Sequence, residues 1–307
     1  PMLFKNAFGG DYKAALYLQN VSDSSSANVS ISYYDSTGTL TCSVTNETLT
    51  PLASKGYWLP TIACLPSGWV GGAVVTSDQP VVAVGRPHIG SQVTTYAGFA
   101  SGSPNMYVPM LFKNAFAGGS YNAALYIQNT DPALAATVNI DFYDSNGSLT
   151  CSLTGESIAA RATKGYWMPS VACLPTGWVG GAVVSANRDV VAVGRPHIGA
   201  QVTTYNGFSA GSPSLRVPML FKNAFAGGTY NAALYIQNTD PALSATVDID
   251  FYDSNGSLTC SLAGETITAL ATQGYWTPAI ACLPPGWVGS AVITANRNVV
   301  AVGRPHV

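Results

Sequence analysis

Six cysteines are the residues best suited to covalent chemistry, and they fall in three pairs whose partners lie 22 residues apart. That separation is too long for a CxxC redox motif. A structural zinc site would need four ligands, whereas each pair has only one histidine to add. The spacing therefore predicts one disulfide per pair: Cys42 with Cys64, Cys151 with Cys173, and Cys260 with Cys282. Closing such a loop should stabilise the fold by about 3 kcal/mol.

The cysteine pairs also predict a location. Disulfides persist in oxidising compartments, so we expect an extracellular or cell-surface protein. The chain starts at Pro1 without a signal peptide, and we interpret it as a mature or excised piece of a longer secreted protein. No apolar run is long enough to predict a membrane span.

The three histidines each follow an arginine in a GRPH motif, as in Arg195 and His197. A histidine beside a positive charge could act as a base. However, no serine or cysteine nucleophile recurs in a recognisable elbow, and Asp189 is replaced by Asn298 in the next copy of the motif. We therefore predict no enzyme and no catalytic residues, and we expect these histidines to be structural or to lie at contacts between domains.

Six tryptophans flank the second cysteine of each pair: Trp58 and Trp69, Trp167 and Trp178, and Trp276 and Trp287. One interpretation is a carbohydrate-binding platform, because flat rings stack on sugar faces. The other is packing over the disulfide, because large rings dominate small cores. Exposure of the side chains would favour binding, and burial would favour structure.

Three further motifs have several chemical interpretations. Lysines in LFKNAF motifs recur together with glutamates, which leaves open an isopeptide bond, an ion pair, or a lysine that protects an edge strand; the residues are Lys5, Lys113, Lys222, Glu47, Glu156 and Glu265. Residues 144–147 lack the glutamate of a calcium loop, so we predict a hairpin turn there, with no metal site and no cofactor. Candidate glycan attachment sites of the N-x-S/T type are Asn20, Asn28, Asn46, Asn146 and Asn255.

The elements that position these residues come in three copies of a unit of about 109 residues. The string PMLFKNAF begins at Pro1, Pro109 and Pro218, which predicts domains at 1–108, 109–217 and 218–307. The joints before the second and third copies contain Gly, Ser and Pro and predict semi-rigid connections. The third copy lacks the counterpart of residues 92–99. If that segment is a core strand, a neighbouring repeat or chain could donate it.

The amino-acid composition and net charge limit the kinds of function that this chain can have. Hydrophobic residues make up 47% of the chain, enough for each unit to bury its own core. Charged residues make up only 9%, against roughly 25% in ordinary soluble proteins. The net charge of −2 provides no basic surface for nucleic acid. A net charge near zero also favours association between molecules.

The second copy shows the strand pattern best. Residues 137–143 alternate apolar and polar side chains, and the Asn146-Gly147 dipeptide that follows is a strong hairpin signal. Further strands are expected at 110–116, 123–128, 149–153, 180–185, 189–193 and 201–205, with a turn at 187–189. About seven or eight short strands per unit, without helical periodicity, predict an all-β fold of tandem antiparallel β-sandwiches.

The strings ALYIQN, TVNIDFYDSNGSL, WVGGAVVSANRDVVAVGRPH and TTYNGF cover most of that unit. They resemble the tandem immunoglobulin-like repeats of bacterial secreted and cell-surface proteins, such as those of filamentous, Chloroflexus-like bacteria. The resemblance implies an immunoglobulin-like sandwich and supplies no catalytic residues. We therefore expect a structural extracellular protein, a segment of a surface fibre, sheath, stalk or filament assembled head-to-tail from copies of itself. The alternative is a carbohydrate-binding or adhesive module array that uses exposed tryptophans.

Overall fold

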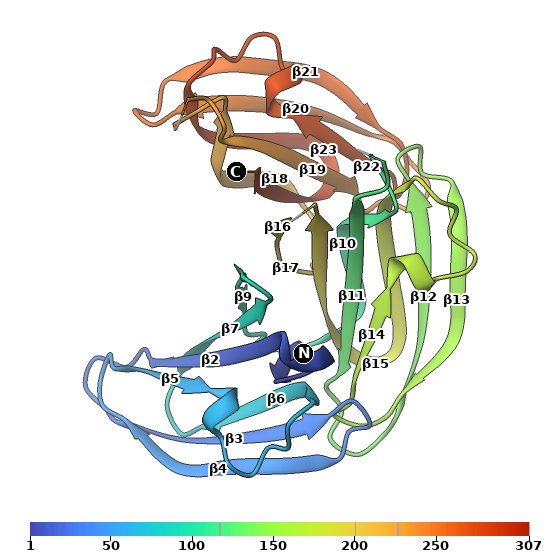
Figure 1. Ribbon diagram of the computed structural model, residues 1–307. Helices are drawn as coiled ribbons and strands as arrows, with labels where there is room; N and C mark the ends of the chain where they lie inside the picture. Colours follow the sequence, from blue (N-terminus) through green and yellow to red (C-terminus); the bar gives the residue numbers. More distant parts are fainter. Residues whose placement is uncertain (117, 200, 226, 307) are drawn as a thin grey trace.

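The computed structural model describes residues 1–307 except residues 117, 200, 226 and 307. The described residues form β-strands and four single-turn 3-10 helices, without an α-helix. The strands follow the sequence repeat and build three consecutive sandwich units, called here repeats 1, 2 and 3. The repeats curve into an open crescent (Figure 1). The predicted all-β sandwich is therefore confirmed.

Repeat 2 shows the whole arrangement. One layer has the strand order β13-β12-β15-β10, and the other has the order β14-β11-β15, with two short strands also paired to β15. The elements are β10 Ser103–Lys113, β11 Tyr121–Asn129, β12 Ala136–Asp144, β13 Leu149–Ile158, β14 Thr163–Trp167, η3 Met168–Ser170, β15 Trp178–Ile198, β16 Gln201–Val202 and β17 Tyr205–Asn206.

Alternation of side chains explains how these strands face the core. In β12, Val138, Ile140 and Phe142 are fully buried, whereas the intervening Asn139 is exposed. The predicted hairpin turn follows, where the Asp144 carboxylate accepts hydrogen bonds of 2.9 Å from two backbone N–H groups of the turn. The hairpin between β12 and β13 is therefore confirmed.

The long strand β15 joins the two layers. Its first part, up to Ala186, pairs with β12, and its second part, from Val190, pairs with β11. The turn predicted at 187–189 is therefore wrong for repeat 2. Repeat 1 does break at this place, because Pro80 stands where repeat 2 has Asp189 and a proline has no N–H for the ladder. In immunoglobulin domains the last two strands instead fold back as a hairpin within one sheet.

Repeats 1 and 3 keep the same order of elements. Repeat 1 contains β1 Leu3–Lys5, η1 Phe8–Gly10, β2 Tyr12–Asn20, β3 Ala27–Asp35, β4 Leu40–Leu49, β5 Ser54–Trp58, η2 Leu59–Thr61, β6 Trp69–Ser77, β7 Val81–Ile89, β8 Gln92–Val93 and β9 Tyr96–Ala97. Repeat 3 contains β18 Ser212–Lys222, β19 Asn231–Asn238, β20 Ala245–Asp253, β21 Leu258–Ile267, β22 Thr272–Trp276, η4 Thr277–Ala279 and β23 Trp287–His306.

The segments predicted as semi-rigid joints belong to strands. Strand β10 begins at Ser103, upstream of Pro109, and pairs with β15 of repeat 2; β18 repeats this arrangement from Ser212. Each repeat after the first therefore starts directly on a strand of its own sandwich. The backbone of these residues completes the edge of the next sheet, which restricts the motion of the predicted semi-rigid joints.

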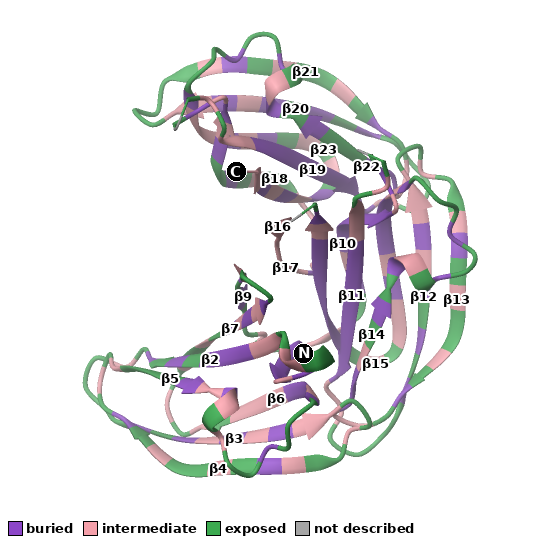
Figure 2. Ribbon diagram, in the orientation of Figure 1, coloured by how far each residue is buried: buried purple, intermediate pink, exposed green. Residues whose placement is uncertain are grey.

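Each repeat has its own core between its two layers. Three large apolar clusters, one in each repeat, contain side chains from both layers. Figure 2 shows burial alternating along the outer strands and becoming nearly continuous along β11 and β19. Continuous burial means that both faces of these strands are covered, which one sandwich alone cannot provide.

Candidate functional site at the repeat junctions

The second face of β11 and of β19 is covered at the junctions between successive repeats. At the first junction, Met2 and Phe4 of repeat 1 pack against Ala124, Tyr126 and Val193 of repeat 2, and all five side chains are at most 8% exposed. The rings of Phe4 and Tyr126 meet edge to face, with 6.3 Å between their centroids. Aromatic pairs in this geometry stabilise a contact beyond their buried area alone.

At this junction, the guanidinium of Arg195 in the GRPH motif is surrounded by three aromatic rings. Its guanidinium lies 5.0 Å from the ring centroid of Tyr126 in its own repeat, and 5.3 and 6.0 Å from those of Tyr12 and Phe4 in repeat 1. The side chain is 4% exposed. A desolvated guanidinium over aromatic faces is attracted by the ring quadrupoles, so this contact favours one orientation of the two repeats.

The second junction repeats the first. Met110, Phe112 and Ala115 of repeat 2 meet Ala233, Tyr235 and Val302 of repeat 3. The centroids of Phe112 and Tyr235 are 5.8 Å apart. Arg304 takes the place of Arg195; it is 2% exposed, and burial lowers its pKa. Two junctions built from equivalent side chains indicate one recurring mode of packing.

A tyrosine after each of the first two GRPH motifs holds the backbone of the segment that enters the junction. The Tyr205 hydroxyl accepts a hydrogen bond from the Met110 N–H and donates one to the Met110 carbonyl, both at 2.9 Å. Tyr96 bonds Met2 in the same way at 3.2 Å. Burial raises the pKa of both tyrosines, so the hydroxyls stay protonated.

The segment that carries this tyrosine is not a core strand. It forms only the two-residue strands β8 and β9 in repeat 1, and β16 and β17 in repeat 2. In repeat 3, Val217 and Leu220 approach Gly303, at the place where Tyr205 approaches Gly194 in repeat 2. Repeat 3 thus forms an apolar core from its own described residues, with Leu215 and Ala301 only partly buried against it. Donation of a strand to repeat 3 by a neighbour stays a prediction.

A cleft opens beside each junction, with a volume of about 450 Å³ at the first and about 740 Å³ at the second. Trp167 borders the first cleft together with Phe8 and Tyr12 of the preceding repeat. Trp276 borders the second together with Phe116 and Tyr121, again from the preceding repeat. Each cleft is therefore made by two repeats together.

The tryptophans divide into two groups. Trp69, Trp178 and Trp287 are at most 5% exposed and meet Tyr33, Phe142 and Phe251 edge to face. Trp167 and Trp276 are each 39% exposed, and Trp58 is half-buried. This second group packs edge-on against His88, His197 and His306 of the GRPH motifs.

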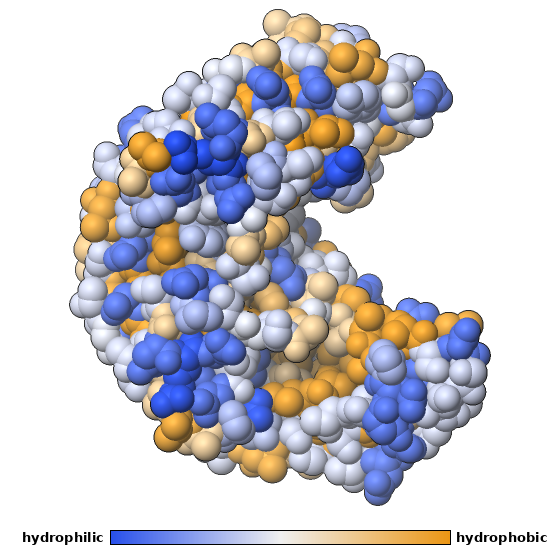
Figure 3. Space-filling view, turned by 180° about the vertical axis from the view of Figure 1, so that it is seen from behind, coloured by the Kyte–Doolittle hydropathy of each residue, from blue (hydrophilic) through white to orange (hydrophobic). Residues whose placement is uncertain are grey.

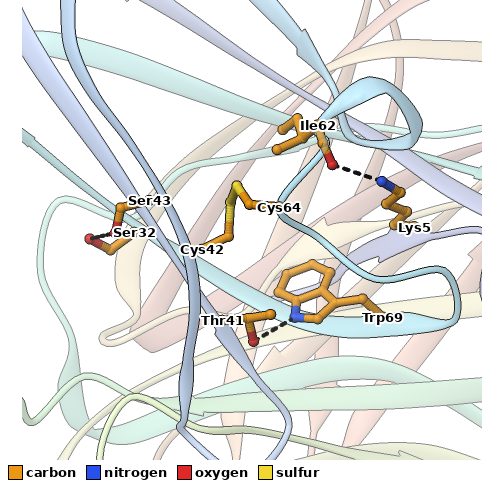
Figure 4. The surroundings of a disulfide bond; sticks show 8 residues. All are labelled: Lys5, Ser32, Thr41, Cys42, Ser43, Ile62, Cys64 and Trp69. Atoms are coloured by element: carbon orange, nitrogen blue, oxygen red, sulfur yellow. Dashed lines mark hydrogen bonds between the residues drawn. A yellow bond between two sulfur atoms is a disulfide. The ribbon is translucent and has the colours of Figure 1, made fainter.

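The cysteines pair as predicted, within each repeat. Cα–Cα distances are 5.6 Å for Cys42–Cys64, 5.5 Å for Cys151–Cys173 and 5.5 Å for Cys260–Cys282, within the usual range for disulfides. Figure 4 shows the bond linking β4 to the loop before β6, beside Trp69. Three disulfides indicate an oxidising, non-cytoplasmic setting.

The recurring lysines and glutamates do not meet. Lys5 is buried and donates a 2.7 Å hydrogen bond to the carbonyl oxygen of Ile62 (Figure 4). Lys113 and Lys222 donate equivalent bonds to carbonyl oxygens in their own repeats. Glu47 instead pairs with Lys55. The expected ion pair between these lysines and glutamates and the isopeptide bond are therefore wrong. A buried lysine capping the disulfide loop replaces them. Lys5 does lie on an edge strand, β1, as expected, but its charge is buried rather than presented to solvent.

The candidate glycan sites differ in accessibility. Asn20 is fully buried, and its amide donates hydrogen bonds to the carbonyls of Ser25 and Leu49 at 2.7 and 3.0 Å. Asn20 is therefore excluded as an acceptor in the folded chain, because its nitrogen is already used and covered. The remaining candidates are exposed: Asn28, Asn46, Asn146 and Asn255.

Within the described residues, no three His, Cys, Asp or Glu side chains are grouped so as to hold a metal ion. No helix in the same part of the chain has the length and apolarity needed to cross a membrane. The GRPH histidines pack under tryptophans, and burial lowers the pKa of His197 to about 4, with a smaller contribution from Arg195. His197 is therefore neutral near pH 7.

Sequence reasoning missed the residues that build the junctions, including Phe4, Tyr126 and Arg195. A signal was present in the AALYIQN string of β11. Its apolar residues are continuous rather than alternating, which is typical of a strand covered on both faces. The sequence repeat alone did not show which surface of a neighbouring repeat covers the second face of β11.

No protein-family model matches the chain. No curated protein matches it in sequence. Among solved structures, the crystal structure of Thermotoga maritima 1070 is similar at 18% identity and a TM-score of 0.30, over 35% of this chain and 94% of that one. The Anabaena sensory rhodopsin transducer is similar at 18% identity and a TM-score of 0.26, over 30% and 87%. Likenesses of this strength carry no functional argument.

Proposed function

We propose that this chain is a structural protein of the cell exterior, a segment of a surface fibre, sheath, stalk or filament built from disulfide-linked β-sandwich repeats. The observation that carries the proposal is the recurrence of one junction. Phe4 with Tyr126 and Phe112 with Tyr235 join successive repeats in the same way. An array with equivalent packed junctions keeps a defined curvature and transmits load from repeat to repeat.

Other features support a mechanical role. Each disulfide closes a loop inside a repeat, so a repeat under load cannot extend through that loop. The junction clusters are apolar, so they do not weaken with salt as exposed ion pairs do.

The test is immunogold electron microscopy of the source cells, with antibodies raised against the folded chain. We expect label along filaments, sheaths or stalks outside the cell. Label confined to the periplasm, or spread as free monomer in the medium, would contradict a structural role. Preabsorbing the antibody with purified chain provides the control for specificity.

A second candidate function is carbohydrate binding in the junction clefts. The observation in its favour is that Trp167 and Trp276 are each 39% exposed and border these clefts. Glycan-array binding should then be lost in the Trp167→Ala, Trp276→Ala double variant, with unfolding still cooperative. Trp58→Ala is the matched control, since the described chain has no preceding repeat to form a cleft beside it.

A further inference from the structure

The two ends of the array expose the faces that the junctions bury. On repeat 3, Met219 is 58% exposed and Phe221 is only half-buried. Their counterparts Met110 and Phe112 in repeat 2 are 1% and 0% exposed, because repeat 3 covers them. Repeat 3 thus carries the same aromatic face without a repeat to cover it.

Repeat 1 exposes the opposite face. Tyr17, Val82 and Val84 are 40%, 50% and 37% exposed. Their counterparts in repeat 2 are Tyr126, Val191 and Val193, of which none exceeds 8% exposure, because repeat 1 packs on that side. Figure 3 shows hydrophobic surface on the side of repeat 1 that faces the opening of the crescent.

We propose that the exposed face of repeat 3 docks onto the exposed face of repeat 1 in a second copy of this chain, through the contacts of the internal junctions. This inference rests on the proposed structural function and specifies its assembly contact. Phe221 would meet Tyr17 of the neighbouring copy, as Phe4 meets Tyr126 within the chain. Arg86 would lie against Phe221 and Tyr230, as Arg195 lies against Phe4 and Tyr12.

The two exposed faces indicate a second copy as the occupant. Each has a buried counterpart at an internal junction: Phe221 corresponds to Phe112, and Tyr17 corresponds to Tyr126. Repeat 1 of a second copy offers repeat 3 the side chains that repeat 3 itself offers repeat 2, so the packing seen twice within the chain can recur between chains.

The contact joins two different faces, so it is heterologous. Such contacts close into rings when their rotation returns to the start and otherwise grow into open helical filaments. The net charge of −2 leaves little repulsion between copies. Rings and filaments are both consistent with the proposal, whereas a symmetric dimer that joins like faces is not.

The test compares purified 307-residue chains by sedimentation velocity and negative-stain microscopy, from about 1 μM to about 1 mM. Wild-type chain should associate with increasing concentration. Phe221→Glu and Tyr17→Glu should each weaken association by roughly 100-fold or more, because an unpaired charge would enter an apolar contact. Leu258→Glu is the matched control: Leu258 is 55% exposed on β21, away from both faces, and its variant should associate like wild type.

Mixing the two blocked variants tests the geometry. Phe221→Glu keeps a working repeat 1 face, and Tyr17→Glu keeps a working repeat 3 face. The mixture should therefore form one-to-one dimers and nothing larger.

The inference is overturned if wild-type chain stays monomeric at the highest concentration, if the blocked variants associate like wild type, or if their mixture forms no dimer. Failure of the proposed function is a different result. Chains that associate as described but are absent from surface fibres would retain the docking contact and refute the structural role. Labelled fibres made of a chain that does not self-associate would refute the docking contact alone.

Discussion

Replacing Phe112 by alanine should destabilise the chain by about 4 kcal/mol, the usual cost of removing a fully buried aromatic ring. Phe112 is 0% exposed, and its ring centroid lies 5.8 Å from those of both Tyr121 in its own repeat and Tyr235 in repeat 3. Removal would leave a cavity walled by two repeats, which cannot collapse without moving one repeat against the other.

Phe221 provides the matched control, because it occupies the same position in repeat 3. Its ring meets Phe225 and Tyr230 of its own repeat, at 5.8 and 6.1 Å, but it is only half-buried among the described residues. Alanine there leaves no closed cavity, so we expect a loss of about 1 kcal/mol from transfer of the partly exposed ring. The difference of about 3 kcal/mol measures what the neighbouring repeat contributes.

The assay is urea unfolding followed by tryptophan fluorescence, on protein dilute enough to prevent association. With a slope of about 2 kcal/mol/M, Phe112→Ala should lower the midpoint by about 2 M and Phe221→Ala by about 0.5 M. Equal shifts for the two variants would refute the reasoning, because the ring's contribution would then arise entirely within its own repeat. Phe4→Ala should behave like Phe112→Ala.

Three further outcomes are expected from the same assay. Replacing both Cys151 and Cys173 by serine should cost about 3 kcal/mol, and an unchanged midpoint would show that the loop is already constrained without the bond. Tyr205→Phe should cost about 1–3 kcal/mol, because the backbone N–H and carbonyl of Met110 lose their partner; a cost near zero would contradict the role given to this hydroxyl. Burial lowers the pKa of His197 from 6.5 to about 4, so the unfolded chain binds a proton that the folded chain does not between these values. Stability should therefore fall as pH drops from 6.5 toward 4, and His197→Gln should reduce this dependence; an identical pH profile in the variant would refute it.

The local pattern predicted most strands, because alternation decides which side chains face a core whatever lies beyond it. Val138, Ile140 and Phe142 are buried as their spacing indicates. The continuous course of β15 was missed, because polar residues at 187–189 look like a turn. Only the pairing of both halves of the strand keeps the backbone extended there.

Chemical interpretations of single residues were less successful, since they depend on neighbours distant in sequence. Asn20 lies in a valid glycan motif, yet its amide is fixed by the carbonyls of Ser25 and Leu49 inside the fold. Lys5 and Glu47 recur together in the repeats, yet the folded chain places the Lys5 amino group in a hydrogen bond with the Ile62 carbonyl oxygen.

The sequence by itself determined the threefold repeat, the all-β class and the cysteine pairing, because periodicity, alternation and spacing are properties of one repeat. The tertiary structure alone decided which surfaces of successive repeats meet. The same tyrosine is exposed as Tyr17 and buried as Tyr126, because burial depends on whether a preceding repeat packs against that face. Identical residues acquire different roles by their place in the array, and that place exists only once the repeats are packed together.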